Sequence, residues 1–216
     1  MLKQILSVFL ESRCLFCSRP TSESLCQYCQ QKLLSHRLND RNSSWNDLSL
    51  FAWGKYEGQL KRAIALMKYQ NQPDIGRLLG KLLGDVWLNS GLIKPLAKIT
   101  VVPIPLHSNK LNDRGFNQAE LIARGFCQVT GYSLNSQALI RVRDTAAMFD
   151  LSPEERVKNL KNAFQIGHKL PKHPVLMLDD IYTLGTTIKE STQILRQQRI
   201  EVIGAVVVAK SAINNF

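Results

Sequence analysis

Apolar residues recur along the chain with two different spacings, which predict helices in some segments and strands in others. In Pro73–Leu88 they return every three or four positions, the spacing of one helical face. Helices of this kind are also expected at three further segments: Gly58–Tyr69, Asn117–Thr130 and Thr186–Gln198. Short apolar runs that favour buried strands occupy four segments: Leu50–Tyr56, Ile99–Leu106, Val175–Leu178 and Glu201–Ala209.

Continuous apolar strands that alternate with helices are typical of a parallel sheet covered on both faces, so we expect an α/β fold. Gly76, Gly80 and Gly84 form a stripe on the Pro73–Leu88 helix, which predicts close packing against a neighbouring element. Met1–Leu10 is expected to form a short amphipathic helix. Ser152 begins another helix through a capping box with Pro at its first position.

Charge adds information about partners. The chain of 216 residues has 28 Lys+Arg against 17 Asp+Glu, a net charge of +11, which attracts polyanions such as nucleic acids and nucleotides. The alternative is a basic surface that serves solubility. No apolar stretch reaches the roughly 20 residues of a membrane span, and Met1–Leu10 lacks a signal-sequence cleavage site. We therefore expect a cytoplasmic protein without a transmembrane segment.

Four cysteines lie in two Cys-x-x-Cys pairs near the start of the chain. Cys14 and Cys17 form the first pair, and Cys26 and Cys29 form the second. Two such pairs complete a tetrahedral shell around one structural Zn²⁺, and an iron–sulfur cluster is the alternative occupant. Residues 36–47 are polar and predict a linker. The expected domains are therefore residues 1–47, with the helix, zinc module and linker, and residues 48–216, with the α/β domain.

The segment Val175–Thr187 combines an apolar strand, two acidic residues and a small-residue loop that opens a helix. Asp179 and Asp180 are suited to bind a ribose diol, or Mg²⁺ together with substrate oxygens. The loop and helix start provide N–H and hydroxyl donors for a phosphate through Thr183, Gly185, Thr186 and Thr187. The chain has neither a P-loop nor a Gly-x-Gly-x-x-Gly motif, which argues against those nucleotide-binding chemistries.

This string resembles the phosphoribosyl pyrophosphate-binding motif of type I phosphoribosyltransferases, and the chain as a whole resembles the ComF family. The resemblance extends over most of the chain through several motifs: the two Cys-x-x-Cys pairs, Tyr56-Glu-Gly58 with Lys61, Ile64 and Lys68, Val102–His107, Arg114–Gln118, Arg156 with Asn159, Ala163-Phe164, and the Asp-Asp loop. The family is associated with DNA uptake in naturally transformable bacteria.

The resemblance implies a type I phosphoribosyltransferase-like sheet that binds phosphoribosyl pyrophosphate with Mg²⁺. Asp179 and Asp180 would then be the catalytic and ribose-binding residues, while residues near His107 would meet the pyrophosphate. Lys110 and Arg114 flank a loop that would close over the ligand. Two positions depart from the family pattern: Leu184 replaces a Thr of the phosphate loop, and Met148 replaces a Gln.

Two functions follow from these features. One is a phosphoribosyltransferase that transfers or hydrolyses a phosphoribosyl group, with an unknown acceptor. The other is a non-catalytic competence factor that binds a ligand in the same cleft. Its expected partners are single-stranded DNA and the competence machinery. A basic helical face beside an aromatic residue is the expected DNA contact, formed by Lys61, Arg62, Lys68 and Tyr69. Solvated surface explains these four residues equally well.

Overall fold

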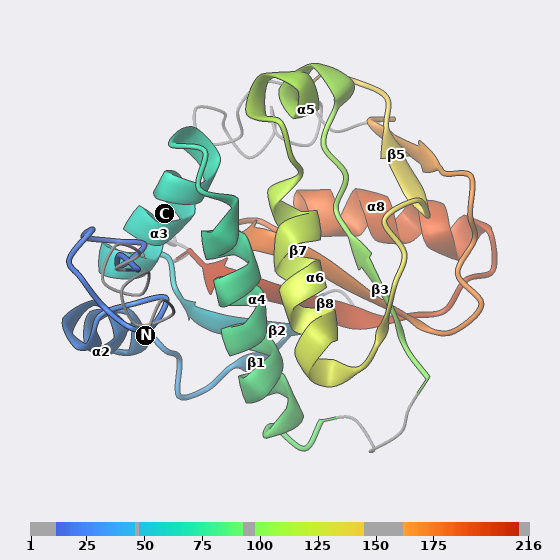
Figure 1. The fold of residues 1–216 in the computed structure, drawn as a ribbon. Helices are drawn as coiled ribbons and strands as arrows, with labels where there is room; N and C mark the ends of the chain where they lie inside the picture. The colour runs from blue at the N-terminus through green and yellow to red at the C-terminus, as the bar shows by residue number, and fades with distance from the viewer. Residues whose placement is uncertain (1–11, 46–47, 93–97, 145–161, 212–216) are drawn as a thin grey trace, which may run out of the picture.

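The computed structural model describes residues 12–45, 48–92, 98–144 and 162–211. Within these residues, six helices and eight strands lie in the order expected of an α/β chain (Figure 1). The helices are α2 (Gln27–Leu34), α3 (Gly58–Tyr69), α4 (Pro73–Leu88), α5 (Ser108–Arg114), α6 (Gln118–Thr130) and α8 (Thr186–Gln197). The strands are β1 (Asn42–Trp45), β2 (Leu48–Lys55), β3 (Thr100–Pro103), β4 (Ser133–Leu134), β5 (Leu139–Arg141), β6 (Phe164–Ile166), β7 (Val175–Tyr182) and β8 (Val202–Lys210).

Six strands form one sheet in the order β1-β2-β8-β7-β3-β4. Every pair in it is parallel except β1–β2, where β1 runs antiparallel along the edge. The strands β5 and β6 make a separate antiparallel pair. The predicted fold class, an α/β chain with a mostly parallel sheet, is confirmed.

Two apolar layers cover the sheet, one on each face. The first packs α3, α4 and α6 against alternate strand residues such as Leu176 and Leu178. The second packs α8 and the β5–β6 pair against the intervening residues, such as Val175 and Met177. Figure 1 shows α4 and α6 in front of the sheet and α8 behind it. Successive residues of a strand point to opposite faces, which is why β7 is buried on both sides.

The glycine stripe of α4 packs against α6, as predicted. A Cβ at Gly80 would lie 2.0 Å from the backbone oxygen of Ile122, so only glycine allows the two helices to approach this closely. Gly84 meets α6 less tightly, with Val129 Cβ at 3.0 Å. The matching glycine of α6, Gly125, faces the backbone oxygen of Arg77. Complementary glycines on both helices therefore set the distance between them.

The N-terminal module continues the core of the first layer. Its buried side chains, including Phe16, Leu25 and Leu33, belong to the same apolar cluster as Leu60 and Ile64 of α3. Arg62 of α3 also donates a hydrogen bond to the carbonyl oxygen of Phe16, with Nη2 3.3 Å away. The module therefore rests on α3 through both apolar and polar contacts.

The structure corrects the prediction that residues 36–47 form a linker. Part of this segment is β1, which adds to the sheet beside β2. His36 is also held in place, because its Nε2 accepts the N–H of Gln59 at 3.1 Å and its ring lies under Gly58. The polar composition suggested a linker. An edge strand such as β1, however, pairs with a neighbour on one side only and tolerates polar side chains.

Two predicted helices and one departure from the family pattern lie outside the described residues: Met1–Leu10, the helix that begins at Ser152, and Met148. The strand predicted as Val175–Leu178 extends to Tyr182, so Asp179 and Asp180 belong to β7 and not to the loop after it. Ladder bonds to β8 continue as far as Tyr182 and Lys210, which explains the longer strand.

Candidate functional site

The carboxyl ends of β3 and β7 lie side by side, and the chain leaves them in opposite directions. After β3 it passes through α5 and α6 to β4, whereas after β7 it passes through α8 to β8. Helices α6 and α8 cover opposite faces of the sheet. Such a reversal of strand order leaves a crevice at the carboxyl edge, where α/β proteins bind ligands. The sequence-predicted ligand residues cluster at this edge.

Asp179 and Asp180 point to opposite faces of β7 because they are adjacent strand residues. Both are buried, with 9% and 4% of their surface exposed. The Oδ1 atom of Asp179 accepts the backbone N–H of Asp180, and Oδ1 of Asp180 accepts that of Ile181, each at 2.8 Å. Each carboxylate therefore has one oxygen fixed by the backbone.

The second oxygen of Asp180 forms an ion pair with Lys68. Lys68 lies in the last turn of α3, and only 16% of its side chain is exposed. Burial by itself lowers the pKa of Lys68, but the charge and hydrogen bond of Asp180 outweigh it and hold this pKa above its usual value. Lys68, predicted as part of a nucleic-acid surface, is thus placed beneath that surface and against the acidic pair.

Asp179 lies on the other face, near Arg141 of β5. Burial raises the pKa of Asp179 well above its usual value, and the negative charge of Asp180 raises it further. The charges of Asp179 and Asp144 both act on Arg141, whose own pKa is lowered by burial. The guanidinium of Arg141 also stacks over Phe164, 5.4 Å from the ring centroid. The acidic pair is therefore flanked by a cation from each layer.

The loop after β7 leads into α8 through Gly185, which has a left-handed φ of 72°. A Cβ at this position would lie 2.7 Å from the ring of Tyr182, so both the turn and the packing require glycine. No side chain caps the first turn of α8. Thr183, Leu184, Thr186 and Thr187 are half-buried around this turn, at the positive end of the helix dipole.

Helix α5 brings a second group of polar residues to the same edge. His107 caps α5, with Nδ1 accepting the N–H of Asn109 at 3.3 Å. Asp144 ties this helix to the end of β5, because it accepts a 2.9 Å hydrogen bond from Asn109 Nδ2 and lies 3.9 Å from Lys110 Nζ. Burial lowers the pKa of Lys110, and the charge of Arg141 adds to this effect.

The predicted ligand residue Arg114 ends α5 and donates a hydrogen bond to Gln118. Asn117 lies between them and has two roles. Its Oδ1 accepts the N–H of Ala119 and caps α6, and its Nδ2 donates to the carbonyl oxygen of Ile104 at 3.0 Å. The start of α6 is thereby fixed to the end of β3. Arg114 is held beside the crevice where the strand order reverses.

Sequence reasoning missed Arg141 and Asp144 at this edge, and it did not predict that Lys68 pairs with Asp180. Arg141, Asp144 and the Lys68–Asp180 pair all depend on contacts between elements distant in the chain. A local signal existed only for Asn117, which precedes a helix as a typical N-cap residue.

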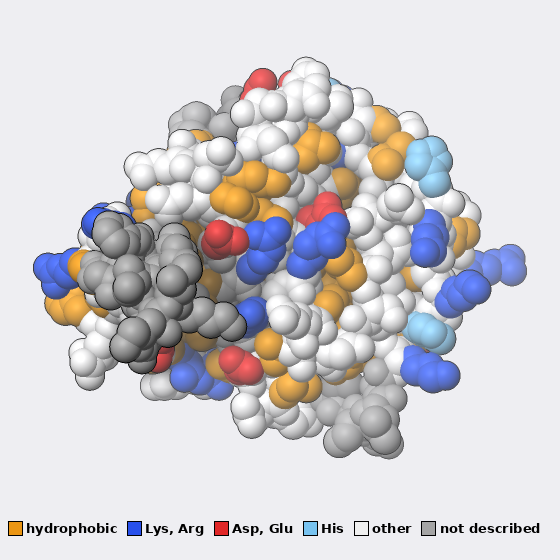
Figure 2. Space-filling view, in the orientation of Figure 1, with side chains coloured by type: hydrophobic (Ala, Val, Ile, Leu, Met, Phe, Trp, Pro, Cys, Tyr) orange, Lys and Arg blue, Asp and Glu red, His pale blue; other side chains and the backbone are white. Residues whose placement is uncertain are grey.

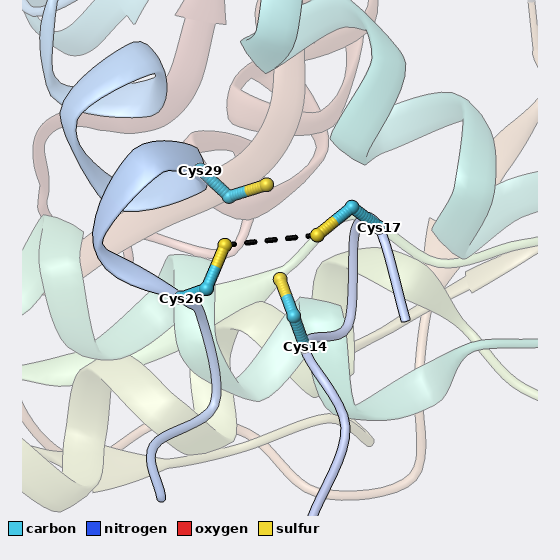
Figure 3. Close-up of side chains that lie close together, drawn as sticks. All are labelled: Cys14, Cys17, Cys26 and Cys29. Carbon is cyan, nitrogen blue, oxygen red and sulfur yellow. Dashed lines mark hydrogen bonds between the residues drawn. The ribbon is translucent and has the colours of Figure 1, made fainter. Parts of the chain in front are cut away.

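The four cysteines of the N-terminal module converge, as Figure 3 shows. Cys14 and Cys17 come from a turn closed by the 2.8 Å hydrogen bond from Ser18 N–H to Cys14 O, and Cys26 and Cys29 lie at the start of α2. All four Sγ atoms lie within 4.8 Å of one another, and those of Cys17 and Cys26 are 3.6 Å apart. Zn–S bonds of about 2.3 Å in a tetrahedron require sulfurs about 3.8 Å apart, so the donor set fits one zinc.

Backbone N–H groups around the cysteines also favour the thiolate form of Cys14, the form that binds a metal. Burial raises the pKa of Cys14, but backbone N–H groups of Cys26, Phe16 and Cys17 more than offset this and lower it to about 6. Burial and the neighbouring thiols raise the pKa of Cys29 instead. A zinc ion with these four protein ligands would have no open position for a substrate, as is typical of structural zinc sites. Cys127 lies apart from this group, in α6, where it packs against the first apolar layer.

The other predicted nucleic-acid residues remain on the surface. Lys61 and Arg62 are exposed, Tyr69 is 70% exposed, and Lys61 Nζ lies 5.8 Å from the centre of the Tyr56 ring. Figure 2 shows the cations of one face spread over several regions, and those over α4 and α6 lie beside acidic side chains. Two such pairs are Arg77–Asp74 and Arg124–Glu120. On this face the net charge does not form one continuous patch.

A cavity of about 310 Å³ lies at the opposite end of the sheet, where β2, β7 and β8 begin. Its walls are mostly apolar, with Phe51, Trp87 and Ile203 among them, and no titratable residue lines it. This cavity therefore lacks the groups needed for chemistry on a charged ligand.

Comparison with known proteins gives relatives that span most of the chain. The DNA utilization protein YhgH of Salmonella typhi is 30% identical over 193 residues, covering 84% of this chain and 83% of the relative. This chain belongs to the ComF family. Competence protein F of Haemophilus influenzae is 28% identical over 90% of the chain and 95% of its own length. Competence protein ComFC of Bacillus subtilis is 23% identical, covering 86% and 72% respectively.

No protein-family model matches the chain. Among solved structures, a UMP synthase of Leishmania donovani aligns with 70% of this chain at 20% identity and a TM-score of 0.38, and the chain spans 24% of that synthase. A hypoxanthine phosphoribosyltransferase of Staphylococcus aureus aligns with 67% at 15% identity and a TM-score of 0.36, over 77% of its own length. Within the described part of the chain, every helix is too short or too polar to traverse a bilayer.

Proposed function

We propose that this protein binds phosphoribosyl pyrophosphate, or a closely related phosphoribosyl ligand, at the carboxyl edge of β3 and β7 and acts in DNA uptake during competence. The observation that supports binding of this ligand is the buried Asp179–Asp180 pair, which is followed by the uncapped start of α8. Both lie where the strand order of the sheet reverses. The names of the relatives, which refer to competence and DNA utilization, support the process.

Each group at this edge has a role in the proposal. The N–H groups at the start of α8, with the hydroxyls of Thr183, Thr186 and Thr187, would bind the 5′-phosphate. The acidic pair would accept hydrogen bonds from the ribose hydroxyls. On the α5 side, Lys110 and Arg114 would meet the pyrophosphate and stabilise the charge that develops as it departs. Mg²⁺ bound to the pyrophosphate oxygens would neutralise part of the same charge.

A binding experiment tests this proposal. Zinc-loaded protein titrated calorimetrically with phosphoribosyl pyrophosphate in Mg²⁺ buffer should bind one equivalent, and Asp179→Asn with Asp180→Asn should abolish binding while circular dichroism stays unchanged. Asp85→Asn, on the exposed side of α4, is the matched control and should bind normally. Equal affinity in the double variant would show that the ligand binds elsewhere.

A substitution at position 184 should increase the affinity for phosphoribosyl pyrophosphate. Leu184→Thr adds a hydroxyl donor to the phosphate loop without touching the acidic pair. One neutral hydrogen bond contributes about 0.5–1.5 kcal/mol net, so we expect binding to tighten roughly 2- to 12-fold. Unchanged affinity would place the phosphate outside this loop.

Catalysis and binding without catalysis differ in one readout. An enzyme would release pyrophosphate from the bound ligand when the acceptor or water attacks the ribose carbon. A ligand-binding competence factor would bind the same ligand and release none. Measuring pyrophosphate release with purified protein, alone and with nucleobases, separates the two functions.

Single-stranded DNA binding is the second candidate, and a surface of the zinc module favours it. Tyr28, between Cys26 and Cys29, is 58% exposed. The cationic groups of Arg19 and Lys32 both lie 5.9 Å from the centre of its ring. An exposed aromatic ring beside cations is suited to stack a base while the cations contact phosphates. We propose this surface in addition to Lys61, Arg62 and Tyr69.

A further inference from the structure

Lys68 behaves differently from the other cations of α3. Lys61 and Arg62 are exposed, whereas Lys68 turns inward to Asp180, and both partners are largely buried. Asp179, on the other face of β7, is still close enough for its charge to act on the ammonium group, and the Tyr56 side chain lies near it as well. A buried ammonium is stable only with a partner that compensates its charge. The buried ammonium of Lys68 therefore depends on its contact with Asp180.

This pair affects how the carboxylates can meet a divalent cation. Asp179 and Asp180 point to opposite faces of β7, and one oxygen of each is already bonded to a backbone N–H. The free oxygen of Asp180 is the one that Lys68 contacts. A Mg²⁺ ion held by protein carboxylates needs one or two such oxygens in near-octahedral geometry. The donor set does not fit a Mg²⁺ chelated by both residues unless Lys68 is displaced.

We infer that Lys68 is a positioning residue that serves as the fixed counter-ion of the acidic pair: it holds Asp180 toward α3 and excludes free divalent cations from the pair. This role of Lys68 deepens the proposed function, and it rests on that function only for the identity of the ligand. The carboxylates are then available to hydroxyl groups of the ligand, and a divalent cation enters the site only on the ligand's own phosphates. With Arg141 on the opposite face, the carboxylates also repel an anionic ligand less than an unpaired Asp-Asp would.

Mn²⁺ binding without any phosphoribosyl ligand tests this inference separately from the proposed function. Mn²⁺ prefers the same oxygen ligands as Mg²⁺ and is counted by electron paramagnetic resonance. In zinc-loaded protein we expect the same Mn²⁺ binding curve for the unaltered chain and for Asp180→Asn. Lys68→Met should gain one site per chain. The gain in affinity should be at least about 10-fold, because an adjacent opposite charge changes the proton affinity of a carboxylate by about 1–3 pKa units and acts on a divalent cation at least as strongly.

Two further variants make the result specific. The added site should disappear in Lys68→Met combined with Asp180→Asn, which removes the carboxylate that the ion would bind. Lys81→Met, an exposed lysine of α4, is the matched control and should bind Mn²⁺ as the unaltered chain does. If the unaltered chain already binds Mn²⁺ through Asp180, or if folded Lys68→Met gains no site, the inference is wrong.

Lys68→Met leaves Asp180 buried without its cation, so a second measurement uses the unaltered chain alone. Acetic anhydride acetylates lysines that are free of tight contacts, and mass spectrometry reports each site. We expect slow acetylation of Lys68 relative to Lys81, at a rate that millimolar Mn²⁺ leaves unchanged. Faster acetylation of Lys68 in Mn²⁺ would show that the metal displaces it from Asp180, which would overturn the inference.

Discussion

Adjacent residues of the same type acquire different chemistry at this site. Asp179 and Asp180 differ by one position, but the alternation of a strand sends one to the layer of β5 and the other to α3. Asp180 obtains a lysine as partner, whereas Asp179 is deeply buried beside a second carboxylate. The two residues should therefore respond differently to pH and to substitution.

The raised pKa of Asp179 predicts how its removal changes stability with pH. A carboxyl whose pKa is higher in the folded than in the unfolded protein holds its proton more tightly when folded. It therefore lowers stability progressively as pH rises from the ordinary value of about 4 through the raised value. Asp179→Asn should raise the melting temperature near neutral pH, and the difference from the unaltered chain should shrink toward pH ~4.

Thermal melts across this pH range measure the effect, with Asp85→Asn as the exposed control. The control should shift the melting temperature little at any pH. A lower melting temperature for Asp179→Asn near neutral pH would mean that its hydrogen bond from the Asp180 N–H and its attraction to the charge of Arg141 outweigh the burial of its charge.

Among the elements, the α4–α6 pair shows how a sequence feature sets tertiary geometry. The Gly80 Cα lies so close to α6 that an added methyl group would overlap a backbone oxygen, which cannot turn away as a side chain can. Gly84 has about an ångström more room. The same substitution at these two positions should therefore have different effects.

Gly80→Ala should destabilise the protein although alanine favours helix formation by about 1 kcal/mol. Overpacking costs typically 1–3 kcal/mol, and here backbone must move, so we expect a net loss of about 1–2 kcal/mol. For a chain of this size that lowers the melting temperature by roughly 2–8 °C. Gly84→Ala should change it less. Equal effects in urea or thermal unfolding would show that α4 and α6 are farther apart than described.

The zinc module and α3 should respond to metal together. Phe16 and Leu33 share a core with α3, and Arg62 donates to the turn that holds Cys14 and Cys17. Chelation, or Cys17→Ser, should remove about one zinc per chain and unfold the module, since structural zinc contributes on the order of 10–16 kcal/mol in small peptides. Hydrogen exchange should increase in α2 and also in α3.

Elemental analysis of gently purified protein gives the metal content, and Cys127→Ser is the matched cysteine control, which should retain it. Iron in place of zinc would identify the alternative cluster. Faster exchange confined to α2, with α3 unchanged, would show that the module is independent of the α/β layer.

Across the whole molecule, the net charge of +11 favours association with polyanions. If phosphate contacts dominate single-stranded DNA binding, log affinity should fall linearly with log salt, by about 0.7 per phosphate neutralised. Lys61→Ala with Arg62→Ala should make this slope shallower by roughly one to one and a half units. Fluorescence anisotropy with labelled oligonucleotides measures it.

Stacking of DNA bases on exposed aromatic rings should affect the measured affinity differently from phosphate contacts. Tyr28→Ala should leave the salt slope unchanged but lower affinity at high salt, because stacking contributes about 1–3 kcal/mol per base. Lys81→Ala with Lys172→Ala removes two exposed cations elsewhere and should alter the slope less than the Lys61–Arg62 pair does. Affinity that does not depend on salt would exclude a phosphate-dominated mode.

Local spacing along the chain was enough to predict several features of the fold. Helices α3 and α4 begin and end at the predicted residues, and the two Cys-x-x-Cys pairs meet as their spacing requires. Apolar strand runs predicted the parallel sheet because a strand buried on both faces has no polar side. These signals lie within one element or one turn, where periodicity and chain geometry leave few alternatives.

The residues that complete the site come from distant parts of the chain, and their pairing could be seen only in the folded protein. Lys68 and Asp180 are separated by most of the α/β fold in sequence, and nothing near Lys68 distinguishes it from the exposed cations of the same helix. Its partner follows from the position of α3 over the carboxyl end of β7. The edge strand β1 was likewise missed because its pairing with β2 depends on backbone hydrogen bonds, to which polar composition is a poor guide. Ion pairs and ladder bonds form between surfaces that exist only after the layers pack.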